Sequence, residues 1–366
     1  MNSLGLYIHV PFCDGKCNYC DFYSFKATSK ELDEYTDILV EQIVLWSNKL
    51  IDKTVDTVYF GGGTPSLLGT SRLVRIIEAI RKAFKIACDC EITLEANPTS
   101  ANSIDFSELK INGFNRVSLG MQSALDEELK LLGRRHLKAD VITSVDNIRK
   151  SGISNISLDV MLGIPQQNEK SLIETLDFSI FLDVPHISTY MLSVEPDTVF
   201  GRFRERFTFA DDDAQAKFYM LTSDYLKKQG FTHYEISNFC KDNKYSRHNM
   251  RYWELKDYLG LGPSAHSLIG SKRFYYPKSI EAFKNGQFIE DGEGKTKDEY
   301  IMLMLRTDRG VNNKDFKLLF GEDLSDSFIR KAKTYERHGY IKTDDNGISL
   351  TEKGFLLSNT IIADLI

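Results

Sequence analysis

The sequence predicts an α/β fold on a parallel sheet, followed by a small C-terminal α+β domain of winged-helix type. Strand-like and helix-like segments alternate through the first half of the 366 residues, and the alternation stops near Val194. Such alternation is typical of parallel sheets, whose strands are joined by crossover helices. The expected strands cover residues 6–10, 57–61, 91–96, 116–121, 157–161 and 186–192.

Helical patterns join these strands, and glycines at positions 113, 133 and 152 stand where three of the helices should end. The expected helices cover residues 30–49, 71–84, 103–112, 126–132, 138–151 and 169–182. Carboxyl ends of parallel strands commonly carry the functional groups of an α/β fold. The polar or special residues that follow the expected strands are Cys13, the turn at 61–65, Glu95, Gln122, Asp159 and Tyr190.

Three domains are expected. Residues 1–194 form the core, with about residue 235 as an alternative boundary, and residues 195–295 form a connecting region with a helix at 211–229. Residues 296–366 should form the winged-helix-type domain, with helices near 299–305, 316–320 and 324–338, a turn at 344–347 and a final helix. From Lys297 onward this tail carries 11 Lys or Arg and 12 Asp or Glu, so we expect a lid or docking module and not a DNA reader.

The bulk composition narrows the class of protein. A net charge of −6 argues against non-specific nucleic-acid binding, and we find no apolar run near the ~20 residues that span a bilayer. The start, MNSLGLYIHV, lacks the basic region of a secretory signal. We therefore expect a protein of the reducing cytoplasm, in which Cys88, Cys90 and Cys240 are inert thiols.

Cys13, Cys17 and Cys20 form a C-x3-C-x2-C run directly after the first expected strand. Thiolates select soft metals and iron–sulfur clusters, and a four-iron cluster normally takes four cysteines. Three local cysteines would leave one iron open to an exchangeable ligand. A structural zinc site is the alternative, but it needs a fourth ligand and Asp21 is a poor one.

This cysteine spacing resembles the signature of the radical S-adenosylmethionine (SAM) superfamily. The phrases YIHVPFC and GGGTP are similar to the anaerobic coproporphyrinogen III oxidase family, including its heme-chaperone (HemW-type) subgroup, from about Leu6 to the C-terminus. The resemblance implies a partial (β/α)6 barrel with a [4Fe-4S] cluster on Cys13, Cys17 and Cys20. It also implies SAM on the fourth iron, where one electron would break a C–S bond to give methionine and a 5′-deoxyadenosyl radical.

The resemblance also implies the residues that contact SAM. Glycines let the backbone approach a ligand, Glu95 and Asp159 can accept hydrogen bonds from ammonium or ribose hydroxyls, and Arg134 can pair with a carboxylate. The alternative is that these are ordinary polar residues of a barrel mouth, and Tyr7 could equally belong to the core. The expected SAM residues are Tyr7, Tyr19, Gly62, Gly63, Thr64, Glu95, Gln122, Arg134 and Asp159.

Two departures separate this chain from the dehydrogenases of the family. Their pattern has a further cysteine where this chain has Phe22, and they carry a longer stretch before the cysteines than the twelve residues found here. The motif H-N-x-x-Y-W, starting at His248, is a mark of the heme-chaperone subgroup. His248 is the expected heme ligand and His266 a second candidate; the alternative for His248 is a hydrogen-bonded histidine that shapes a loop beside the SAM pocket.

The resemblance therefore implies a heme chaperone that binds the cluster, SAM and heme, and passes heme to an acceptor such as a membrane respiratory protein. One alternative is an oxygen-independent coproporphyrinogen III dehydrogenase, which would decarboxylate two propionates to vinyl groups. A radical SAM enzyme acting on an unrelated substrate is another. No nucleic-acid partner is expected, and both a monomer and a homodimer remain open.

Overall fold

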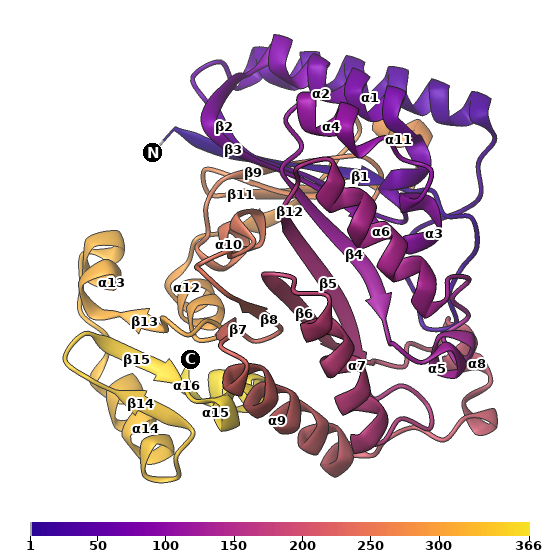
Figure 1. Cartoon of the computed structure of the whole chain (residues 1–366). Helices are drawn as coiled ribbons and strands as arrows, with labels where there is room; N and C mark the ends of the chain where they lie inside the picture. Colours follow the sequence, from indigo (N-terminus) through magenta and orange to yellow (C-terminus); the bar gives the residue numbers. More distant parts are fainter. Residues whose placement is uncertain (1) are drawn as a thin grey trace.

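Strands and helices alternate through the first half of the chain, as expected, in a computed structural model that describes residues 2–366 (Figure 1). The strands of this half are β1 (Ser3–Val10), β2 (Thr54–Gly62), β3 (Lys85–Ala96), β4 (Arg116–Gln122), β5 (Asn155–Leu162) and β6 (His186–Met191). Its helices are α1 (Ser29–Lys49), η1 (Pro65–Leu68), α2 (Thr70–Ala83), α3 (Pro98–Ala101), α4 (Phe106–Ile111), α5 (Asp126–Leu131), α6 (Lys138–Lys150) and α7 (Glu169–Phe181).

The six strands β1 to β6 pair in parallel and in chain order. Strands in such a sheet are covered on both faces, and all seven residues of β4 are accordingly buried. Figure 1 shows α1, α2, α4 and α6 on the outer side of the sheet. The predicted parallel α/β fold is confirmed, although the helix expected at 103–112 begins only at Phe106, where Asp105 caps it.

Strand register aligns the carboxyl ends of β1 to β6 at one end of the sheet. Val10 pairs with Gly62 across β1 and β2, and Leu162 pairs with Met191 across β5 and β6. Each loop that follows one of these strands therefore starts at the same end of the sheet. The sequence predicts the functional residues at this end.

Residues 195–295 extend the same sheet at both of its edges. The elements here are α8 (Val199–Arg202), η2 (Arg204–Arg206), α9 (Asp212–Lys228), β7 (Thr232–Glu235), β8 (Asn238–Cys240), α10 (Arg247–Trp253), β9 (Tyr258–Leu261), β10 (His266–Ile269), β11 (Lys272–Tyr275), α11 (Ile280–Lys284) and β12 (Ile289–Glu293). The full strand order is β12-β11-β10-β9-β1-β2-β3-β4-β5-β6-β8-β7. The sequence predicted α9 but missed these strands, because three to five residues are too few to establish an alternating pattern.

The C-terminal segment has its own three-stranded sheet, in the order β13-β15-β14. Its elements are α12 (Lys297–Met304), β13 (Val311–Asn312), α13 (Asn313–Phe320), α14 (Asp326–Arg337), β14 (Ile341–Thr343), β15 (Gly347–Leu350), α15 (Glu352–Leu356) and α16 (Ser358–Leu365). This order of helices followed by a β-hairpin is the predicted winged-helix arrangement, at the lower left of Figure 1. Its apolar core is continuous with Tyr219 of α9 and Tyr258 of β9.

Among the helices of residues 2–366, none is both long and apolar enough to cross a membrane.

Packing of the parallel sheet should dominate the stability of the fold. Leu158 on β5 is fully buried, whereas Leu318 on α13 is 85% exposed. We expect Leu158→Ala to lower the free energy of unfolding by about 2–5 kcal/mol, because it removes buried methyl groups and leaves a cavity. Leu318→Ala is the matched control and should change it by less than about 0.5 kcal/mol. Urea midpoints followed by circular dichroism measure both, and equal shifts would contradict this packing.

Candidate cluster and nucleotide site

A cavity of about 410 Å³ opens at the carboxyl ends of the parallel strands. It brings together all of the residues expected to hold the cluster or SAM except Tyr7. The expected residues that line it are Cys13, Cys17, Cys20, Tyr19, Gly62, Gly63, Thr64, Glu95, Gln122, Arg134 and Asp159. Residues far apart in the sequence thus share one site.

The three cysteines lie on the loop between β1 and α1, and backbone bonds fix this loop without using the thiols. The Cys13 amide donates to the Phe25 carbonyl at 2.9 Å, and the Cys20 amide donates to the Cys17 carbonyl at 3.2 Å. The Asn18 side chain donates to the Leu131 carbonyl at 2.8 Å, which ties the loop to the end of α5. The three cysteines line the cavity, where the Cys13 thiol donates to the Gly15 carbonyl at 3.0 Å and contacts the Thr64 hydroxyl at 3.3 Å.

The chemistry of this donor set fits an iron–sulfur cluster. Cys13, Cys17 and Cys20 all line the cavity, and three thiolates would leave one iron of a four-iron cluster open to another ligand. Burial raises the pKa of the Cys20 thiol, and the Arg134 guanidinium lies 3.6 Å from the Cys17 sulfur, where it would stabilise a thiolate. Cys88, Cys90 and Cys240 lie outside the cavity and are free thiols.

The glycine turn after β2 presses against the cysteine loop. The Gly63 amide donates to the Val10 carbonyl at 2.8 Å, and the Thr64 amide donates to the Phe12 carbonyl at 2.7 Å. A Cβ atom on Gly63 would lie 2.5 Å from the Phe12 carbonyl oxygen. This oxygen belongs to the backbone and cannot move aside as a flexible side chain could. The turn accordingly requires glycine here, and its backbone forms part of the cavity wall.

Two carboxyl groups inside the cavity have raised pKa values. Burial raises the pKa of Glu95 to about 7, against the hydrogen bond that the Tyr59 hydroxyl donates to it at 2.7 Å. Burial likewise raises the pKa of Asp159 to about 6, against a hydrogen bond from Ser118 at 3.1 Å. Both groups would be ionised more readily beside a cationic ligand than in the free protein.

Two further polar side chains at the cavity have buried atoms without a partner. Arg134 donates to the Asn97 amide oxygen at 2.7 Å and to the Gly120 carbonyl, but its Nε is unpartnered. Gln122 has an unpartnered Oε1 and a φ of 69°, at an irregularity that ends β4. Unsatisfied buried polar atoms are uncommon in native proteins, so these two fit a site for a polar ligand.

Tyr7 and the two candidate heme ligands lie outside the cavity. The Tyr7 hydroxyl contacts His9 Nδ1 at 3.1 Å, and its ring faces the Tyr59 ring at a centroid distance of 6.2 Å. His266 begins β10 on the exposed surface and stacks on Tyr275 at 5.0 Å. Both residues therefore lie apart from the residues that line the cavity.

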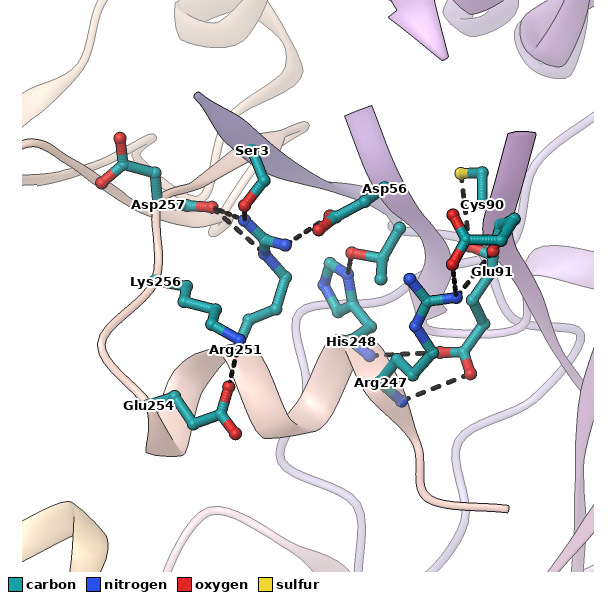
Figure 2. A network of polar contacts seen from close by, with 12 residues as sticks. Ser3, Asp56, Cys90, Glu91, Arg247, His248, Arg251, Glu254, Lys256 and Asp257 are labelled. Carbon is teal, nitrogen blue, oxygen red and sulfur yellow. Dashed lines mark hydrogen bonds and ion pairs between the residues drawn. The ribbon is translucent and has the colours of Figure 1, made fainter. Parts of the chain in front are cut away.

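The position of His248 goes against its expected role as an iron ligand. It is fully buried on α10, which Figure 2 shows against the strands. Its Nδ1 contacts the Thr57 hydroxyl at 2.9 Å, and its Nε2 contacts the Tyr252 hydroxyl at 2.8 Å. Neither nitrogen is free for heme, so the geometry favours the alternative of a hydrogen-bonded structural histidine.

Several cavity residues escaped the sequence reasoning, namely Asn97, Ser118, Gly120 and Met161. The signal for two of them was present. Ser118 and Gly120 lie two residues apart on β4, so alternation places them on the same face of the strand. A strand assignment with strict alternation would have found them.

Comparison with known proteins identifies the family of this chain. The Radical SAM superfamily model matches residues 7–179, and the HemN C-terminal domain model matches residues 298–357. A protein of Bacillus subtilis named Heme chaperone HemW is 34% identical over 97% of both chains, and one of Mycobacterium tuberculosis H37Rv with the same name is 32% identical over 99% of this chain and 94% of its own. The chain belongs to the HemW family of radical SAM proteins.

The structural comparison bears on the fold. The solved structure of the coproporphyrinogen III oxidase HemN of Escherichia coli superposes with a TM-score of 0.84, covering 100% of this chain and 90% of that one. At 21% identity, this likeness shows that the HemW-family chain and HemN share a fold. The predicted radical SAM fold, with its appended C-terminal domain, is thereby confirmed.

The three cavity cysteines should be the cluster ligands. We expect Cys17→Ala to abolish the iron–sulfur absorbance after anaerobic reconstitution, because a cluster held by two thiolates is too weakly bound to survive. The unchanged protein should carry about four iron and four sulfide ions per chain. Cys88→Ala, at an exposed cysteine of β3, is the control and should leave these contents unchanged. A cluster retained in Cys17→Ala would show that the ligands are assigned wrongly.

The raised pKa of Glu95 predicts a pH-dependent cost in stability. Its pKa in the folded state, about 7, lies above its ordinary 4.5, so the cost is present above pH 7 and is lost as pH falls toward 4.5. We expect Glu95→Gln to raise the free energy of unfolding by about 1–2 kcal/mol at pH 8 and by much less at pH 5. Urea unfolding at both pH values measures this, with the exposed Glu127→Gln as control. A gain of equal size at pH 5 would contradict the assigned cause.

Proposed function

We propose that this protein is a heme chaperone that holds a [4Fe-4S] cluster, SAM and heme, and passes heme to an acceptor protein. The observation that carries the proposal is the 34% identity, over 97% of both chains, with a relative named Heme chaperone HemW. The clustered thiols and the polar cavity beside them support the cofactors. We expect the acceptor to be a respiratory protein of the membrane, and the site of action to be the cytoplasm, where thiols stay reduced.

The cavity residues suggest how the cofactors would be held. Cys13, Cys17 and Cys20 would bind three irons, leaving the fourth open to SAM. When bound, the pair supplies a one-electron reduction centre beside a cleavable C–S bond. The backbone of the glycine turn and Glu95 would take the ammonium group, and Arg134 would take the carboxylate. Gln122 and Asp159 suit the ribose hydroxyls, because both carry acceptor oxygens.

The heme itself would rest on the rim of this cavity. Phe22 and Tyr190 both line the cavity yet are 60% and 42% exposed, an unusual position for large rings. Their faces suit a flat apolar macrocycle, and the exposed Lys16 beside them can pair with a propionate. Phe22 stands where the resemblance places the further cysteine of the dehydrogenases, which favours the chaperone over the decarboxylase.

One anaerobic experiment tests the proposal. Reconstituted protein should develop a Soret band with added hemin, transfer that hemin to an apo-cytochrome, and yield no protoporphyrinogen IX from coproporphyrinogen III. We expect Phe22→Asp to weaken hemin binding about tenfold, because it places a charge against the macrocycle. Phe181→Asp, at a ring 74% exposed on α7, is the control and should bind as the unchanged protein. Steady turnover of coproporphyrinogen III, or failure to bind hemin, would refute the proposal.

A further inference from the structure

Helix α10, which contains the whole H-N-x-x-Y-W motif, is fastened to β1, β2 and β3 (Figure 2). The Glu91 carboxylate accepts from the backbone amides of Arg247 at 3.3 Å and His248 at 3.1 Å. Arg251 is 2% exposed and pairs with Asp56. These contacts hold α10 in one position against the strands.

His248 connects α10 to the strand residues that lie nearer the cavity. Both of its ring nitrogens are hydrogen-bonded, as described above, so the ring cannot turn without losing a bond. Burial, with a smaller contribution from the positive charge of Arg251, lowers its pKa to about 3, and the ring is therefore neutral at physiological pH. Its flat face lies against the Tyr59 ring, at a centroid distance of 5.2 Å and an interplanar angle of 26°.

Tyr59 completes a continuous set of contacts from α10 to the cavity. Its hydroxyl donates to Glu95 Oε1 at 2.7 Å, and the other oxygen, Oε2, accepts from the Gly62 amide at 3.3 Å. Glu95 and Gly62 are cavity residues, whereas His248 and Tyr59 are not. The motif thus reaches the cavity through one ring and one carboxylate.

We propose that His248 is a positioning residue for the SAM site, holding Tyr59 so that Glu95 faces the SAM ammonium group. The inference rests on the proposed function, because it takes Glu95 as a SAM contact. Without the imidazole, Tyr59 keeps the Tyr7 ring at 6.2 Å but loses the nearer of its two stacking partners, while the Thr57 and Tyr252 hydroxyls lose their partner. The Tyr59 ring is then held less firmly, and its hydrogen bond to Glu95 weakens.

A change in the pH dependence of SAM binding would report this role. The hydrogen bond from Tyr59 lowers the Glu95 pKa, so its loss leaves more of the carboxyl protonated near pH 7. A protonated carboxyl attracts an ammonium group less. The other groups that face Glu95 are Tyr7 on β1, Arg116 on β4, Asp159 on β5, Tyr190 on β6 and Tyr252 on α10.

The test is the dissociation constant of SAM from anaerobically reconstituted full-length protein between pH 6.5 and 9, by calorimetry. We expect His248→Ala to bind SAM about tenfold more weakly at pH 7, with the midpoint of the pH profile moved upward. His248→Gln should restore most of the affinity, because its amide can both donate and accept. Tyr59→Phe should reproduce the pH shift. His233→Gln, at a buried histidine of β7 outside the cavity, is the control and should leave SAM affinity unchanged.

Each outcome has a distinct meaning. Unchanged SAM affinity in His248→Ala across the pH range would overturn the inference while leaving the proposed function intact. Absence of SAM binding by the unchanged protein would refute the cofactor assignment, and this inference with it. Loss of hemin binding in His248→Ala with normal SAM affinity would instead restore the histidine as an iron ligand. If His248→Ala fails to fold, His248→Gln and Tyr59→Phe decide the matter, because normal pH profiles in both would overturn the inference.

Discussion

The parallel pairing of β1 to β6 is the constraint on which the site depends. Hydrogen bonding in chain order aligns the ends of the strands, so that Gly62 lies beside Val10 and the cysteine loop meets the glycine turn. No single loop carries the site. A slip of one residue between two strands would reverse which side chains face the interior, and residues such as Glu95 or Asp159 would leave the cavity.

The same arrangement buries several charged side chains between the strands. Arg116 on β4 is 1% exposed, and its Nε and Nη1 have no hydrogen-bond partner. Its guanidinium is balanced by the nearby carboxyls of Glu91 and Asp159, which keep its pKa raised despite burial. An apolar interior would be more stable, since unpaired buried polar groups cost free energy. The fold tolerates this cost beside Glu95 and Asp159, the carboxylates that the proposed function assigns to SAM.

Sequence reasoning found those parts of the molecule that leave a local pattern. The strand at residues 116–121 and the cluster of Cys13, Cys17 and Cys20 were readable because spacing along the chain encodes them. Short strands such as β9 were not, because four residues carry no period and their pairing partner is β1, some 250 residues earlier in the chain. The surroundings of His248 could not be predicted for a related reason. A motif identifies the residue type, but only packing against Thr57 and Tyr252 decides whether a nitrogen remains free.

The two ends of the sheet differ in what they require of their side chains. In the proposed function, the cavity end holds groups that would meet charged SAM, and such groups need fixed neighbours because their orientation decides the binding energy. The opposite end has no such demand and is closed by α10, whose Arg251 and Glu91 contacts are buried. Connecting the two through rings is physically sound, because aromatic side chains are rigid and lose little entropy when packed. Under the proposed role of His248, a motif that marks a family would act on the SAM site without touching it, through the contacts of His248 with Tyr59 and of Tyr59 with Glu95.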